Sequence, residues 1–356
     1  MLLFKAAARA AFCCALAAAG ASAQSRRVFP ISIDTVAAQS ATASPGEGAE
    51  ETDSQPAHIF QTTIRKLLDE EDFGRLEELA AAARSEKSRF LGGGWKLKEF
   101  YTVIENPGSM TATDAVWNAH IERLKRWCAL NPDSATPRVA LAQAYLRFAH
   151  KARGTGIGRA VTPDGQQIFA QRVATAYDVL QQAKALPNKD AQWYWAMQIV
   201  SLSQQWNRRQ AEELLEQAAA FEPGYYYYYN RFQAYLFVNG KPGDIERFAQ
   251  ETADRIGGPE GDFVYFEMAM SINCCGVRTF LPGFSWDRVK QGFASLEQLY
   301  GSTNQQRNAI AFVALRMGDK EFAQTMFARI GDDWTQSVWG HKESFDQSKA
   351  SLTLVR

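Results

Sequence analysis

Apolar residues recur at three- and four-residue spacing along most of the chain between His58 and Trp339, and alternating runs typical of strands are few. This spacing places apolar side chains on one face of a helix, so it predicts helices throughout the region. Proline and glycine divide the pattern into segments that are mostly one or two helices long. The main dividing positions are Pro107, Pro132, Pro187, Pro223, Gly240, Pro259 and Pro282.

A fixed period runs through the middle of the chain. Three prolines stand 36 residues apart, and an aromatic residue follows each of them by six positions. A period of this size is typical of stacked helical hairpins, none of which buries its apolar face alone. The pattern therefore predicts an all-α helical solenoid. The paired positions are Pro187 with Trp193, Pro223 with Tyr229, and Pro259 with Tyr265.

Two segments resemble the tetratricopeptide repeat, which forms a right-handed solenoid of helical hairpins. One segment matches the terminal proline and the start of the next first helix, at Asn131, Pro132, Leu141, Ala142 and Tyr145. The other matches both helices and the turn between them, at Ile310, Ala311, Gly318, Asp319, Ala323 and Phe327. The match departs from the repeat at Arg307, where tryptophan is usual, and at Ala314, where tyrosine is usual.

A narrower resemblance covers roughly residues 73–273. The blocks that carry it are residues 152–156, 191–194, 222–226, 243–244 and 248–249. Together they are similar to a bacterial family of tetratricopeptide-like proteins, domain of unknown function four-zero-three-four. The resemblance implies the fold of degenerate repeats and brings no assigned activity.

The N-terminal residues resemble an export signal. Lys5 and Arg9 precede a short apolar run over residues 10–19, and Ala21-Ser22-Ala23 supplies the small residues that a signal peptidase requires. We expect a cleaved signal peptide at residues 1–23 and a protein that is exported, either periplasmic or secreted. We further expect a flexible leader at 24–57, which is poor in large apolar residues, a helical-repeat domain at 58–339 and a tail at 340–356.

Charge and hydropathy exclude several classes of partner. The chain has 39 basic and 39 acidic residues, and loss of residues 1–23 would leave 37 and 39. Nucleic-acid binding relies on excess lysine and arginine, so we expect no nucleic-acid partner. Beyond the signal peptide no apolar run reaches 18 residues, which predicts no transmembrane segment in the mature chain.

The densest aromatic sequence is the run Tyr225–Tyr229, preceded by the tryptophan-rich segment 193–206. Helices inside a solenoid are contacted on two sides, so core packing is the favoured interpretation. Tyrosine and tryptophan also suit a groove for a peptide or glycan, and this is the alternative. The candidate binding residues here are Trp193, Trp195, Trp206, Tyr228 and Tyr229.

Two glycine-rich segments interrupt the helical pattern. Arg153, Gly154 and Gly156 belong to a loop whose backbone and arginine would suit a carboxylate or phosphate, although an irregular structural loop is the favoured interpretation. The glycine spacing does not fit a dinucleotide site. Residues 92–94 are three glycines that we interpret as a separator between two helices.

Cleavage would leave three cysteines, which are Cys128, Cys274 and Cys275. An odd number in an oxidising compartment permits a strained vicinal bond or a bond from Cys128 to one of the pair, and the sequence does not choose between them. Buried, unpaired thiols remain the favoured interpretation. No CxxC or His-containing cluster indicates a metal, and we expect no metal and no cofactor.

No known catalytic motif occurs in the chain, and we assign no catalytic residue. The favoured function is a noncovalent scaffold or binding module of the cell envelope that holds a protein, peptide or envelope component. One alternative is an enzyme whose helical array encloses a cleft, for example for carboxylate-dependent glycan cleavage. Another is a structural component of an oligomer.

Overall fold

The computed structural model describes residues 50–154, 162–272 and 283–352, and every regular element in this part of the chain is a helix. Within it, no helix has both the length and the hydrophobicity needed to cross a bilayer. The predicted all-α fold is confirmed. The helices are α3 (Glu50–Asp69), α4 (Phe73–Glu86), α5 (Lys96–Ile104), α6 (Asp114–Leu130), α7 (Thr136–Arg153), α8 (Pro163–Ala183), α9 (Ala191–Ser203), α10 (Arg208–Phe221), α11 (Tyr227–Asn239), α12 (Asp244–Ile256), α13 (Gly258–Ser271), α14 (Trp286–Tyr300), α15 (Asn304–Met317), α16 (Lys320–Ile330), α17 (Gln336–Trp339) and α18 (Lys342–Ser351).

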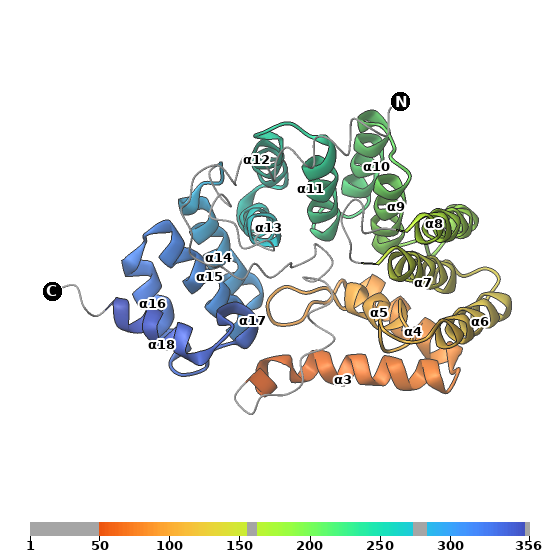
Figure 1. The fold of residues 1–356 in the computed structure, drawn as a ribbon, viewed down its shortest axis with the longest axis horizontal. Helices are drawn as coiled ribbons and strands as arrows, with labels where there is room; N and C mark the ends of the chain where they lie inside the picture. The colour runs from red at the N-terminus through yellow and green to blue at the C-terminus, as the bar shows by residue number, and fades with distance from the viewer. Residues whose placement is uncertain (1–49, 155–161, 273–282, 353–356) are drawn as a thin grey trace.

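The helices form two layers that follow a nearly closed ring (Figure 1). The inner helices α5, α7, α9, α11 and α13 contact one another in this order, and outer helices such as α8, α10 and α12 pack between and behind them. Inner helix α9 is buried along nearly its whole length because neighbours cover both of its sides. Outer helix α12 buries one stripe and exposes charged residues on the other face, as expected for a surface helix.

The 36-residue period marks the starts of successive inner helices. Pro187 precedes α9, Pro223 precedes α11, and Pro259 stands in the first turn of α13. Each aromatic residue that follows at six positions is almost completely buried, so the period repeats a packing position of the solenoid. These residues are Trp193, Tyr229 and Tyr265, which are 3%, 0% and 1% exposed.

A short hairpin between α4 and α5 joins the two ends of the array. Arg89 and Trp95 form an isolated antiparallel bridge, and the tip reaches the loop before α15, where the Gly92 amide donates to the Gly301 carbonyl over 3.2 Å. A side chain at Gly93 would place its Cβ only 2.7 Å from the ring of Phe263, and the backbone φ there is +81°. Glycine is therefore required for this close approach, and the glycines do more than separate two helices.

Arg89 holds the hairpin against the C-terminal half of the ring. Its guanidinium forms an ion pair with Glu260 at 2.7 Å and donates to the Gly224 carbonyl at 3.2 Å. It also lies 4.4 Å from the ring centroid of Trp95 and 4.5 Å from that of Tyr300. One largely buried cation thus contacts groups that lie far apart in the sequence.

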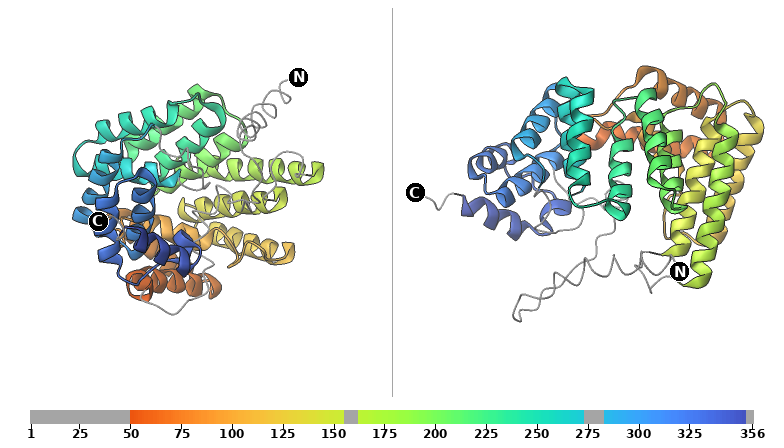
Figure 2. Two further views of the ribbon diagram at one scale, coloured as in Figure 1. Left: turned by 60° about the vertical axis from the view of Figure 1, so that its left-hand side comes forward. Right: turned by 90° about the horizontal axis from the view of Figure 1, so that it is seen from above.

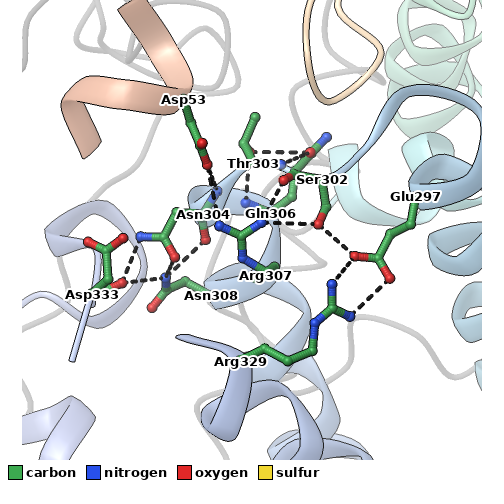
Figure 3. Close-up of polar contacts among 10 residues, drawn as sticks. All are labelled: Asp53, Glu297, Ser302, Thr303, Asn304, Gln306, Arg307, Asn308, Arg329 and Asp333. Carbon is green, nitrogen blue, oxygen red and sulfur yellow. Dashed lines mark hydrogen bonds and ion pairs between the residues drawn. The ribbon is translucent and has the colours of Figure 1, made fainter. Parts of the chain in front are cut away.

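The N-terminal helix α3 makes a second closing contact, at the start of α15 (Figure 3). Asp53 accepts a hydrogen bond from the Asn304 backbone amide at 3.0 Å and forms an ion pair with Arg307 at 3.3 Å. Arg307 in turn donates to the Ser302 carbonyl at 2.6 Å. The side-chain amide of Asn304 donates to the Asp333 carbonyl at 2.7 Å, which ties the same cluster to the segment after α16. Figure 2 shows from other sides that α3 borders the C-terminal helices.

Both predicted ends of the repeat domain differ from the structure. Helix α3 begins at Glu50, within the predicted leader, because Asp53 docks on the start of α15. Helix α18 lies within the predicted tail, where Phe345 is fully buried against Phe327 and Trp339. The described packed structure therefore continues to residue 352. The leader and the tail were predicted from their low content of apolar residues. A helix that docks on an existing surface needs few apolar residues, so composition alone did not reveal α3 or α18.

Candidate functional site

A set of polar side chains lies on the inner helices α5, α7, α9, α11 and α13 and on the residue after α5. On each helix most of them stand three, four or seven residues apart, but Lys98 and Glu99 are neighbours, as are Asn230 and Arg231, so the set covers a broad stripe of each helix. The charges of Glu105, Arg147 and Arg231 all act on Lys98, although the four residues come from three helices. We call the set the inner polar face. It comprises Lys98, Glu99, Glu105, Gln143, Arg147, His150, Trp195, Gln198, Tyr227, Asn230, Arg231 and Glu267.

The centre of this face is the indole ring of Trp195, with cations on it from two other helices. The Lys98 ammonium lies 4.1 Å from the ring centroid and the Arg231 guanidinium 5.2 Å from it, within the range of cation–π attraction. Burial lowers the pKa of Lys98, and the charge of Glu105 opposes this shift. The lysine donates to the Thr102 hydroxyl at 2.8 Å, so the cation is fixed in place.

Beside Trp195 lies a narrow cleft of about 10 Å³, roughly enough for one water molecule. Its walls include Glu105, Gln143 and Arg147. Arg147 pairs with Oε1 of Glu105 at 2.5 Å, and the Gln143 carbonyl oxygen accepts from Gln192 at 3.0 Å. One polar atom of each buried side chain nevertheless has no partner among the described residues, namely Oε2 of Glu105 and Nε2 of Gln143.

Two further amides add unpaired atoms to the inner polar face. Gln198 is only 5% exposed, and neither its oxygen nor its nitrogen has a hydrogen-bond partner among the described residues. The side-chain oxygen of Asn230 on α11 also has no hydrogen-bond partner among the described residues. Each buried polar atom without a hydrogen bond costs about 1–3 kcal/mol. These side chains therefore carry both donors and acceptors that no described residue pairs with.

Glu267 is the acidic residue of the inner polar face on α13. It is partly exposed, yet its surroundings raise the pKa to about 8 by burial, against the opposing charge of Arg89. The charges of Glu267 and Glu99 both act on Tyr227 between them. At neutral pH Glu267 is therefore mostly protonated and can donate a hydrogen bond from its carboxyl group.

Of the predicted aromatic residues, the structure brings only Trp195 into this face. Trp193 is buried and donates to the Leu180 carbonyl at 2.8 Å. Tyr229 is fully buried and donates to the Pro223 carbonyl at 2.8 Å, and Tyr228 is fully buried beside it. These three residues and Trp195, which is 4% exposed, all belong to the hydrophobic core, as the packing interpretation expects.

Trp206 lies apart from that core, in the turn before α10. Its backbone carbonyl accepts from the Tyr235 hydroxyl at 3.1 Å, and its ring meets Tyr177 edge to face. Its side chain is only partly buried. It therefore remains an accessible aromatic residue, on a different part of the surface from Trp195.

The predicted arginine–glycine loop is described only at its start. Arg153 is exposed at the end of α7, with its guanidinium 5.6 Å from the ring centroid of Phe169. Gly154 follows with a φ of +74° and ends the helix. Gly156 lies outside the described residues. The stacking of Arg153 accounts for its position without a ligand, and the structure does not bring it to the inner polar face.

Cys128 on α6 is half-buried and forms no disulfide with a described residue. Burial raises the pKa of its thiol to about 11, so the reactive thiolate is scarce at neutral pH. Cys274 and Cys275 lie outside the described residues, and their pairing stays a prediction. Within residues 50–154, 162–272 and 283–352, no three histidine, cysteine or acidic residues are grouped as a metal site.

The polar amides of this face were not found from the sequence. They come from α7, α9 and α11, and no motif joins them. The one local signal is in α9, where Gln192 and Gln198 interrupt an otherwise apolar helix. A glutamine in the interior of a protein is unusual, and it indicates a position where a hydrogen-bond partner is needed.

Comparison with protein-family models, curated proteins and solved structures gives no match for the chain. The similarity to the bacterial family of unknown function therefore stays a prediction, and the site is interpreted from its own geometry.

Proposed function

We propose that this chain is an exported helical-repeat binding protein that holds a peptide, or a similar amide-rich component of the cell envelope, on its inner polar face. The function is noncovalent. The supporting observation is the group of buried polar atoms without partners, which belong to Glu105, Gln143, Gln198 and Asn230. A ligand that pairs these atoms would recover part of the cost of burying them.

The chemistry of the face favours an uncharged polar ligand. At neutral pH the three basic residues Lys98, Arg147 and Arg231 stand against two carboxylates, because Glu267 is mostly protonated. Arg147 already pairs with Glu105, and burial lowers the pKa of Lys98, so little free charge is left on this face. The unpaired atoms include both donors and acceptors, and a peptide group likewise presents one donor and one acceptor. Trp195, at the centre, is 4% exposed and has the cations of Lys98 and Arg231 on its ring. Selection by hydrogen bonding and shape fits this arrangement better than selection by net charge.

The test is a pair of substitutions at nearly constant volume, Gln198→Leu and Gln143→Leu, which remove the wholly unpaired amide of Gln198 and the unpaired Nε2 of Gln143. The purified chain and both variants are screened on an array of 12-residue peptides of varied sequence. We expect a subset of uncharged peptides to bind the wild-type chain and to lose at least tenfold in affinity with either variant. Because Gln198→Leu removes two unsatisfied buried atoms, its free energy of unfolding should rise by about 1 kcal/mol.

Gln233→Leu is the matched control. Gln233 is equally buried, but its amide donates to the Met268 carbonyl at 3.3 Å and accepts from Ser271 at 3.1 Å. This variant should lose stability and keep its peptide binding. If the wild-type chain binds no peptide, or binds the same peptides as Gln198→Leu with equal affinity, the proposal is wrong.

A second candidate function, catalysis by a carboxyl group, is favoured by Glu267 alone. A general acid must be protonated at the working pH and accessible, and Glu267 meets both conditions. The test is turnover of peptidoglycan fragments by the wild-type chain and by Glu267→Gln. Cleavage that disappears in the variant while fragment binding persists would support an enzyme, and no cleavage by the wild-type chain would reject it.

A further inference from the structure

A second concave feature lies on the outer layer, away from the inner polar face. It is a groove of about 370 Å³ between α10 and α12, with α11 as its floor. This volume is within the range of about 300–1,000 Å³ that is usual for small-molecule sites. Phe232, Leu215 and Phe248 give it an apolar floor and side, and the rings of the two phenylalanines lie 4.9 Å apart between centroids.

The two ends of the groove differ in whether their charged side chains form ion pairs with one another. At the end where both helices begin, Arg208 pairs with Asp244 at 2.9 Å and with Glu212 at 2.7 Å. Asp244 also accepts from the Lys241 backbone amide and from Arg247. The backbone amide and the arginines lower the pKa of Asp244 to about 2. These groups satisfy one another and leave no open site at this end.

At the other end, one acid and one base line the groove without pairing. Glu216 on α10 and Arg255 on α12 form no ion pair with any residue in the described part of the chain. Glu216 lies about 12 Å along its helix from Arg208, and Arg255 about 16 Å along its helix from Asp244, at 1.5 Å per residue. Since Arg208 and Asp244 are in contact, the two unpaired charges stand at nearly the same level on opposite walls.

A buried hydroxyl lines the groove one helical turn before Arg255 on α12. Thr252 lines the groove and is fully buried, and its hydroxyl has no hydrogen-bond partner among the described residues. Charges of opposite sign, an unused hydroxyl and an aromatic floor thus meet at one end of the groove. The arrangement matches a ligand that carries both charges close together and an apolar group beside them.

We propose that this groove binds a free α-amino acid with a large apolar side chain, with its ammonium group on Glu216 and its carboxylate on Arg255. The Thr252 hydroxyl donates to the same carboxylate. The apolar side chain packs on Phe232 and Phe248. The site is independent of the proposed function, because none of its residues belongs to the inner polar face.

The test is isothermal titration calorimetry of the purified chain with L-phenylalanine and L-leucine, and with three phenylalanine or glycine probes that each lack one feature. N-acetylphenylalanine has no ammonium group, phenylalanine amide has no carboxylate, and glycine has no apolar side chain. We expect the two intact amino acids to bind and each probe to bind at least tenfold more weakly.

Three variants assign the contacts. With Glu216→Gln, N-acetylphenylalanine should bind as well as phenylalanine, and with Arg255→Gln the same should hold for phenylalanine amide. Thr252→Val keeps the shape of the side chain and removes an unsatisfied hydroxyl, so it should weaken binding and leave the thermal midpoint unchanged or higher. Glu213→Gln, an exposed acid on the same helix that pairs with Arg209, is the control and should change nothing.

The proposal is overturned if neither amino acid binds at 10 mM, or if glycine binds as tightly as phenylalanine. It is also overturned if Glu216→Gln and Arg255→Gln fold normally and retain the wild-type preference among the probes. Circular dichroism establishes folding for each variant.

Discussion

Removal of the Arg89 side chain should open the ring. In the substitution Arg89→Ala, the hairpin loses an ion pair with Glu260, a hydrogen bond to the Gly224 carbonyl, and its contacts with three aromatic rings. The arginine side chain is 9% exposed and the Glu260 side chain 28%. The variant therefore leaves a partly buried carboxylate with only the Tyr300 hydroxyl as a partner, at 2.6 Å.

The size of the effect follows from this burial. Breaking a buried ion pair by removal of one partner costs about 3–5 kcal/mol, and a cation–π contact contributes about 0.5–2 kcal/mol. Because Glu260 keeps one hydrogen bond and some exposure, we expect a total loss of about 3–4 kcal/mol. Arg89→Lys keeps the charge but not the planar fork of donors, so its loss should be smaller, about 1–2 kcal/mol.

Two measurements test this expectation. Urea unfolding, followed by tryptophan fluorescence and circular dichroism, gives the loss of stability. Hydrogen exchange at the Gly92 amide, which donates to the Gly301 carbonyl, reports whether the hairpin leaves the C-terminal half. The control is Arg209→Ala, where an exposed arginine pairs only with Glu213 on its own helix, and a change of under about 0.5 kcal/mol is expected.

Arg89→Ala would refute the reasoning if it unfolded within 1 kcal/mol of the wild-type chain and left the Gly92 amide as protected as before. The contact of the hairpin with the C-terminal half would then contribute little to the stability of the helical array.

Three other predictions follow from the structure. Gly93→Ala should destabilise the chain by at least about 2 kcal/mol more than Gly108→Ala. Both glycines have a positive φ, at which an alanine costs about 1–2 kcal/mol, but only at Gly93 would the new Cβ lie against Phe263. Equal losses of stability in urea unfolding would contradict the close approach. Glu267 has a folded pKa of about 8, above its unfolded value, so its contribution to stability is complete below about pH 4.3 and is lost as the pH rises through 8. The free energy of unfolding of the wild-type chain should therefore fall between about pH 4.3 and about pH 8, and that of Glu267→Gln should fall less over the same range. Identical pH profiles for the two chains would contradict the assignment. Cys128, with a pKa of about 11, should resist iodoacetamide at pH 7.5 in the folded chain and react in urea, as peptide mapping by mass spectrometry can show; rapid labelling of the folded chain would contradict its burial.

The solenoid itself was predictable because its repeat is a local and periodic property. Pro187, Pro223 and Pro259 mark helix starts, and the aromatic residue six positions later fills the same packing site each time. Core packing as the main role of Tyr228 and Tyr229 was also predictable, since an inner helix has neighbours on two sides.

The closure of the ring was not predictable from local patterns. Gly92 meets Gly301 and Gln306 across more than 200 residues, and three glycines in sequence are equally consistent with a simple connection. The start of α3 was missed for the same reason, because Asp53 is held by a contact with Arg307 rather than by apolar burial. Long-range polar contacts leave no periodic trace in the sequence.

The candidate site was only partly predictable. Trp195 was named as a binding residue, but the amides around it were not, because Gln143, Gln198 and Asn230 acquire their significance only when three helices bring them together. Their lack of partners is a property of packing. Conversely, Arg153 and Trp206 looked suited to binding in the sequence and lie away from the inner polar face.

The most direct test of the account is a crystal structure of the protein purified from its natural host. We predict density for a bound polar molecule on the inner polar face, with hydrogen bonds to Nε2 of Gln143 and to the amide of Gln198. If instead ordered water molecules alone satisfy Glu105, Gln143, Gln198 and Asn230, the inner polar face is a hydrated interior and the central claim is wrong.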